Sequence, residues 1–180
     1  MDKIVNILKG CGVVAMGLTV LAIAAFVLAA IFCRDVGWQV SRTMDAMTDI
    51  ETVTLSLDSS DVFVKGDKRY RPKLVVTLRG EHPGAKILLP FAPVSGDDVL
   101  CRFDSNPPHK GDWKIGDDGF SLHFTDPLDA VCETLATSRR LVIRTKETTG
   151  ALGAVDVAFD LDGFASVFES ALGKNERTHK

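Results

Sequence analysis

Apolar residues are distributed unevenly along this chain of 180 residues. Between positions 10 and 33 there is no charged residue, and Thr19 is the only hydroxyl-bearing side chain. A helix of these 24 residues measures about 36 Å at about 1.5 Å per residue, and the hydrocarbon core of a bilayer is about 30 Å thick. The pattern therefore predicts a single transmembrane helix at 10–33, which anchors the chain in the lipid bilayer after a short head at 1–9.

A cleaved signal peptide and a lipoprotein signal both fit this apolar segment less well than an anchor does. A cleaved signal peptide has an apolar region of about 7 to 15 residues followed by a small-x-small cleavage site, and this run is longer. A lipoprotein signal places a small residue just before the modified cysteine, whereas Cys33 follows Ile31 and Phe32. A retained anchor is the favoured interpretation.

The charges beside the predicted span give a weak orientation signal. Lys3 and Lys9 precede it, and Arg34 and Arg42 follow it. Because a long C-terminal domain is translocated largely regardless of its charge, the short head is expected to stay in the cytoplasm. The predicted location is the bacterial inner membrane, with the N-terminus cytoplasmic and the C-terminal domain periplasmic.

Beyond the span, residues 34–49 show no sustained periodicity and are predicted to be a juxtamembrane connection. From position 50 the pattern changes to period two, with Val53, Leu55 and Leu57 alternating with polar residues, which is typical of a strand with one buried face. Asp118-Gly119 between two short apolar runs predicts a hairpin turn. Further strands are predicted at 74–78, 85–89, 99–103, 113–115, 120–124, 141–145 and 155–159.

Two helices are predicted late in the chain. The first covers 128–137, with Asp126 as its expected N-cap and Pro127 at its first helical position. The second covers 163–172, and the polar tail at 173–180 is predicted to be disordered. The fold class predicted for 50–172 is therefore all-β or α+β, a β-sandwich-like domain with one or two packed helices, preceded by the single transmembrane helix.

The sequence contains no recognisable catalytic signature. The four histidines are isolated from one another and from the cysteines, and no phosphate-binding loop or nucleophile elbow occurs. We therefore predict a non-enzymatic protein with no catalytic residue, metal or cofactor. A hydrolase that uses the turn aspartates or His123 is the alternative, and it requires a cleft that holds a His-acid or acid-acid pair.

The charge pattern gives no support for a nucleic-acid partner, and none is expected. The chain after the anchor carries 19 Lys and Arg against 23 Asp and Glu, without a basic cluster. Charged side chains that flank two predicted strands, together with one tryptophan, form a candidate binding face. Its members are Arg71, Lys73, Arg79, Arg102, Asp104 and Trp113. An ordinary solvated surface, with Trp113 packed in the core or at a sheet edge, is the alternative.

The cysteines and small residues leave two questions open. In an oxidising compartment Cys101 and Cys132 could form a disulfide, although two small buried residues are an equally good interpretation. In the predicted span, Ala25 and Ala29 have the spacing that lets transmembrane helices pack closely. A homo-oligomer is therefore one expectation and a monomer the other.

The ordered motifs after Trp38 resemble the VasI family of type VI secretion-associated proteins, also called TagO. The resemblance rests on WQVSRTMDAMTDIETVTLSLDS, RPKLVVTLRG, VLCRFDSNP, FTDPLDAVCETLATSRRLVIRT and VAFDLDGF. It implies an accessory protein of the bacterial envelope that binds envelope or secretion-apparatus proteins, with Trp38 packed on the domain. A phage or prophage relative acting in superinfection exclusion or host-surface modification is the alternative.

Overall fold

The computed structural model describes residues 37–65, 67–95, 98–150 and 152–173. The predicted head, the anchor at 10–33 with Ala25 and Ala29, and nearly all of the tail at 173–180 lie outside these ranges. Within them, no helix combines the length and apolar character needed to cross a membrane.

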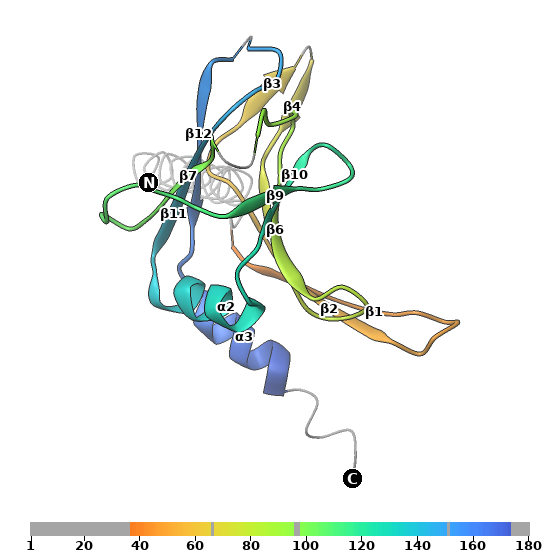
Figure 1. The fold of residues 1–180 in the computed structure, drawn as a ribbon. Coiled ribbons are helices and arrows are strands. Elements are labelled where there is room, and N and C mark those ends of the chain that lie inside the picture. The colour runs from red at the N-terminus through yellow and green to blue at the C-terminus, as the bar shows by residue number, and fades with distance from the viewer. Residues whose placement is uncertain (1–36, 66, 96–97, 151, 174–180) are drawn as a thin grey trace, which may run out of the picture. The chain divides into compact units, whose positions relative to one another are not determined.

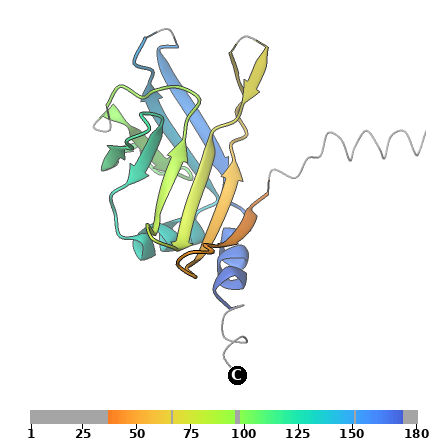
Figure 2. The same ribbon diagram turned by 90° about the vertical axis from the view of Figure 1, so that its right-hand side faces the viewer.

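The larger of the sheets has six antiparallel strands in the order β1-β2-β5-β6-β10-β9. Figure 2 shows its central strands side by side. Cross-strand neighbours alternate between a buried apolar row and an outward row, in which polar residues are joined by Val75 and Leu88. The strands are β1 Gln39–Met44, β2 Glu51–Asp58, β5 Lys73–Arg79, β6 Gly84–Leu88, β9 Trp113–Ile115 and β10 Ser121–Phe124.

A second sheet has four antiparallel strands in the order β12-β11-β7-β8. Its inner side carries Leu141, Ile143, Val157 and Phe159, all fully buried. A separate two-stranded hairpin, β3-β4, lies at the end of the domain away from the helices (Figure 1). The strands are β7 Leu100–Phe103, β8 His109–Lys110, β11 Arg140–Lys146, β12 Ala154–Asp160, β3 Phe63–Lys65 and β4 Lys68–Tyr70.

Two helices, α2 Leu128–Thr137 and α3 Phe164–Gly173, lie together at the other end of the domain (Figure 1). They add Val131, Cys132, Leu135, Phe164 and Ala171 to a core that also contains the inner residues of both large sheets. Each sheet is apolar on one face, and each helix on one side. Packing these apolar surfaces against one another in a single core removes all of them from water. The prediction of a β-rich domain with two helices is confirmed.

The start of the domain differs from the prediction. Residues 39–44, expected to belong to a juxtamembrane connection, form strand β1 at the edge of the six-stranded sheet. The strand has no buried residue, so the alternation that identifies a strand is missing from its sequence. The short strands β3, β4 and β8 were not predicted either, because segments of two or three residues are too short to give a periodic signal.

The beginning of α2 also differs from the prediction. Its N-cap position is occupied by Pro127, and no side chain makes a capping hydrogen bond there. The expected cap by Asp126 is therefore wrong. Pro127 has ψ 140°, so its backbone is extended, and the helix begins at the next residue without a capping hydrogen bond from a carboxylate.

Trp38 packs on the domain, as the family resemblance implies. Its ring centroid lies 4.8 Å from that of Phe164 in α3, and its Nε1 donates a hydrogen bond to the carbonyl oxygen of Leu161 at 3.4 Å. The beginning of the domain is thus held against its last helix.

Candidate functional site

The outer face of the four-stranded sheet carries a concentration of basic side chains. Residues opposite one another on neighbouring strands share a face, so the cross-strand pairs of Arg144 with Asp156, Val142 with Arg102, and Leu100 with Lys110 define this surface. We call it the basic face. Its charged members are Arg102, Lys110, Arg140, Arg144 and Lys146, against Asp156 and Asp160.

One ion pair organises the centre of the basic face. Arg144 donates from Nε to Oδ1 of Asp156 at 2.6 Å and from Nη2 to Oδ2 at 2.7 Å, a bidentate arrangement. These hydrogen bonds, and to a smaller extent the charge of Arg102, lower the pKa of Asp156 below its ordinary value. The carboxylate stays ionised and fixes the plane of the Arg144 guanidinium.

Beside this pair lies a shallow hollow of about 80 Å³. Its walls combine apolar atoms of Leu100, Pro108 and Val142 with Arg102 and the Arg144–Asp156 pair. The Nε atom of Arg102 is buried and has no hydrogen-bond partner among the described residues. An unpaired buried donor costs free energy, on the order of 1 to 3 kcal/mol.

The chemistry of this hollow suits a carboxylate next to an apolar group. A guanidinium presents five donors in a plane that matches the two oxygens of a carboxylate. Asp156 occupies two donors of Arg144, which leaves the other donors of both arginines for a ligand. The basic face can therefore hold an acidic side chain of another protein.

The structure does not gather the six predicted binding residues on one face. Arg71, Lys73 and Arg79 lie before or on β5 of the six-stranded sheet, whereas Arg102 belongs to β7 of the other sheet. Arg71 Nη1 donates to the Ser59 carbonyl oxygen at 2.9 Å, and Lys73 pairs with Asp58 at 3.3 Å. Arg71 and Lys73 thus make their contacts with residues around the six-stranded sheet, and Arg79 is the last residue of β5.

Asp104 and Trp113 have structural surroundings. Asp104 has φ 53, and its Oδ1 accepts the backbone N–H groups of Arg139 at 2.8 Å and Arg140 at 3.0 Å. Trp113 is buried, with its ring centroid 4.2 Å from that of Phe124. The packing interpretation of Trp113 therefore fits the structure, and Arg102 is the predicted binding residue that lies in the hollow.

Cys101 and Cys132 are both buried, and they are free thiols in this structure. The disulfide interpretation is therefore not realised here. Burial raises the pKa of Cys132 to about 11 and also raises the pKa of Cys101. Cys101 Sγ lies 3.2 Å from His109 Nε2, but a thiol with a raised pKa is a weak nucleophile at neutral pH.

A second polar cluster lies at the hairpin between β9 and β10. Asp118 Oδ1 accepts the backbone N–H groups of Phe120 and Ser121, both at 2.9 Å, and the Ser121 hydroxyl at 2.8 Å. The same hydroxyl oxygen lies 3.0 Å from His123 Nε2. Gly116 makes room for the cluster, because a Cβ there would lie 2.2 Å from Ser121 Oγ.

The hydrogen bonds in this cluster are arranged differently from those of a triad that activates a nucleophile. The Ser121 hydroxyl donates its proton to Asp118 and not to His123 Nε2, whereas a triad needs the hydroxyl proton directed at the histidine. The three hydrogen bonds lower the pKa of Asp118, which makes it a poor base. As arranged, the cluster organises the hairpin that the Asp118-Gly119 pair predicts.

The basic face was only partly visible in the sequence. Alternation along 140–146 places Arg140, Arg144 and Lys146 on one side, but their partners come from strands whose pairing the sequence does not reveal. In the described ranges, no group of three or more His, Cys, Asp or Glu residues is placed to hold a metal ion.

Comparisons with known proteins find a likeness at the level of the fold. No family model matches the chain, and no curated protein matches it significantly. The solved structure of invasion associated protein B from Bartonella henselae is similar, with a TM-score of 0.52, 11% sequence identity, and coverage of 77% of this chain and 94% of that one. At this identity the likeness shows a shared fold alone.

Proposed function

We propose that this protein is a membrane-anchored, non-enzymatic binding module of the bacterial envelope, with an accessory role like that of the VasI family. Its basic face holds an acidic group of an envelope or secretion-apparatus protein. The observation that carries this proposal is the hollow on the four-stranded sheet, where a buried Nε of Arg102 lies beside the Arg144–Asp156 pair.

Tethering supports a binding role for the domain. The predicted span ends at Cys33, and the folded unit begins at Gly37. A domain held at the inner membrane meets other envelope proteins at a raised effective concentration, so a shallow, charged surface is sufficient for binding. The proposed location of the domain is the periplasm.

We infer a role without a catalytic centre from the sequence motifs and from the two polar clusters. A protein named for its association with invasion has a similar fold, and the ordered motifs of this chain resemble an envelope accessory family. In the Cys101–His109 pair burial raises the pKa of the thiol, and in the Ser121 cluster the hydroxyl donates to Asp118.

Charge reversal on the basic face tests the binding role. Arg140 and Lys146 are exposed and lie outside the hollow, so Arg140→Glu with Lys146→Glu reverses the charge of the face without altering the Arg144–Asp156 pair. We expect the full-length variant to lose its acidic partner in crosslinked membranes. The control is Lys86→Glu with Lys114→Glu, the same charge change on the six-stranded sheet, which should retain it.

The membrane topology is tested separately. A reporter active only in the periplasm, fused to the C-terminus, should be active, and a cytoplasmic reporter should be silent. The opposite result, or a mature protein that begins after residue 33, contradicts the proposed anchoring. Retention of the partner by the Arg140→Glu, Lys146→Glu variant contradicts the proposed surface.

A further inference from the structure

Strand β1 presents an open edge of the six-stranded sheet. It pairs with β2 on one side, and no described strand pairs with it on the other. It is six residues long and contains neither proline nor lysine, the residues that commonly protect exposed edges. Its one charged residue, Arg42, is engaged by Glu51 at 3.2 Å and by the carbonyl oxygen of Ala171 in α3.

The other sheet edges are shorter or blocked. Strands β9 and β8 have three and two residues. In β12, both backbone groups of Ala158 that point to the open edge are already hydrogen-bonded. The N–H donates to Asp61 Oδ2 at 2.7 Å, and the carbonyl oxygen accepts from the N–H of Ser60 at 3.2 Å. Among the described edge strands of the two large sheets, β1 is therefore the one that is both long and free of such hydrogen bonds from neighbouring segments.

The register of the hairpin determines which backbone groups are open. Asp45 N donates to Ile50 O at the end of the β1–β2 ladder. Because hydrogen-bonded pairs alternate in an antiparallel ladder, Thr43, Ser41 and Gln39 also bond to β2. The N–H and C=O groups of Val40, Arg42 and Met44 therefore point to the open edge.

These three residues are self-complementary about a two-fold axis. When a second β1 approaches antiparallel with Arg42 opposite Arg42, Val40 lies opposite Met44, and all three residues of each strand form hydrogen-bonded pairs. Val40 is 47% exposed and Met44 62% exposed, so the pairing covers two apolar side chains per copy. Each Arg42 brings its own Glu51, which offsets the repulsion between the two guanidinium groups.

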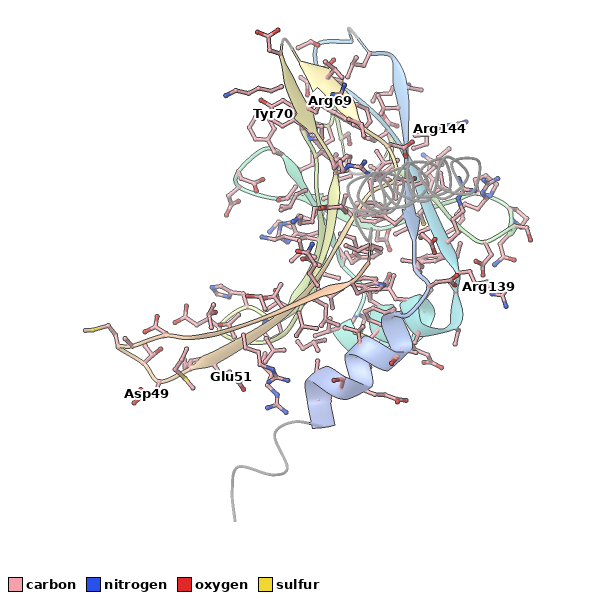
Figure 3. The ribbon with its side chains drawn as sticks, turned by 180° about the vertical axis from the view of Figure 1, so that it is seen from behind. Asp49, Glu51, Arg69, Tyr70, Arg139 and Arg144 are labelled. Atoms are coloured by element: carbon pink, nitrogen blue, oxygen red, sulfur yellow. The ribbon has the colours of Figure 1, made fainter. Side chains whose placement is uncertain are left out.

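We propose that a second copy of this chain binds at β1, by antiparallel pairing of the two β1 strands in the register that places Val40 opposite Met44. The two six-stranded sheets then form one continuous sheet. Figure 3 shows Glu51 on the β1–β2 hairpin, on the side of the domain away from Arg144. The dimer therefore leaves the basic face accessible, and it does not depend on the function proposed for that face.

Cysteine crosslinking of the full chain in membranes tests the register. In it Ser41 faces Thr43 of the second copy in a non-hydrogen-bonded pair, with Cα atoms about 4.5 Å apart, within the range of a disulfide. Two differently tagged copies, one Ser41→Cys and one Thr43→Cys, both lacking Cys11 and Cys33, should give a mixed disulfide dimer on mild oxidation. Ser41→Cys copies alone should not, because their Cα atoms lie more than about 7 Å apart.

A matched pair of substitutions tests the edge itself. Met44→Lys puts a charge into the paired strand and should lower the crosslink about tenfold, equivalent to about 1.4 kcal/mol. Met47→Lys makes the same change in the adjoining turn, where Met47 is 93% exposed, and should leave the crosslink unchanged. Val40→Lys serves as a second edge variant, and the fluorescence of Trp38 and Trp113 reports whether each variant is folded.

Several results would overturn the proposal. These are the absence of a mixed dimer, equal crosslinking by Ser41→Cys copies alone, an equal loss with Met47→Lys, or crosslinking only to a different protein. The last result would assign the edge of β1 to another partner.

Discussion

The Asp61 carboxylate accepts the backbone N–H of Ala158 at 2.7 Å across 97 positions of sequence. Asp61 follows β2 of the six-stranded sheet, and Ala158 lies in β12 of the four-stranded sheet. Ser59 completes the link by donating from Oγ to the Ala158 carbonyl oxygen at 2.8 Å. Hydrogen bonds at an edge thus join the two sheets, in addition to their common hydrophobic core.

Loss of this link should destabilise the domain. Asp61→Ala leaves the N–H of Ala158, a buried residue, without its acceptor, and we expect a loss of about 1 to 3 kcal/mol in the free energy of unfolding. Urea unfolding of the full-length protein in detergent measures the change. Substitution of the exposed Asp112 by alanine is the control, and equal stability of both variants would contradict the role of Asp61.

Gly116 should tolerate a side chain less well than Gly119. A Cβ at Gly116 meets Ser121 Oγ at 2.2 Å and His123 Nε2 at 2.7 Å, so Gly116→Ala should cost about 1 to 3 kcal/mol through displacement of the cluster. Gly119 has φ 70 and open space around its Cα, so Gly119→Ala should cost about 1 kcal/mol through backbone conformation alone. The order of the two urea midpoints checks this prediction, and the reverse order contradicts it.

Acidification should destabilise the domain through His123. Burial, aided by the charge of Lys86, lowers its pKa below the ordinary value of about 6.5, so the unfolded chain binds this proton more readily. The stabilisation is fully present above that ordinary value and is lost as the pH falls from it through the lowered pKa of the folded state. The Tm should decline as the pH falls below about 6.5, and less steeply in His123→Gln.

A control at a second histidine makes the pH test specific. His82→Gln removes an exposed imidazole from the turn between β5 and β6 and should keep the full decline in Tm. If His123→Gln shows the same slope as the unsubstituted protein, another group controls the pH dependence.

The core thiol of Cys132 should resist alkylation in the folded protein. Its pKa, raised to about 11 by burial, leaves little thiolate at pH 8. Treatment with iodoacetamide followed by peptide mass spectrometry should show slow modification of Cys132, which becomes fast in urea. Rapid labelling of the folded protein would contradict its burial, and a recovered Cys101–Cys132 linkage would support the disulfide interpretation.

Much of the fold could be predicted because its strands bury one face. Val53, Leu55 and Leu57 in β2 alternate with polar residues, and this signal does not depend on distant parts of the chain. Strand β1 lacked the signal, since Arg42 and the adjoining Trp38 meet α3, which comes more than 120 residues later. Local periodicity cannot indicate such a contact.

The candidate site was harder to predict for a related reason. Arg102 and Arg144 lie on β7 and β11, and only the antiparallel pairing of these strands brings them to one hollow. In the sequence, Arg102 was grouped with cations near β5 that the structure places in the other sheet. The charge of a strand can be read from its sequence, but its neighbours in the sheet cannot.

Site-specific photocrosslinking from the basic face tests the central claim most directly. A photoreactive residue at Val142, which is half-buried in the hollow, should crosslink in intact cells to an acidic envelope protein, and the adduct should disappear with Arg140→Glu and Lys146→Glu. The same residue at Val75, a half-buried valine on the outer face of the other sheet, should give no such adduct. Equal adducts from both positions, or an adduct that survives charge reversal, would contradict binding at the basic face.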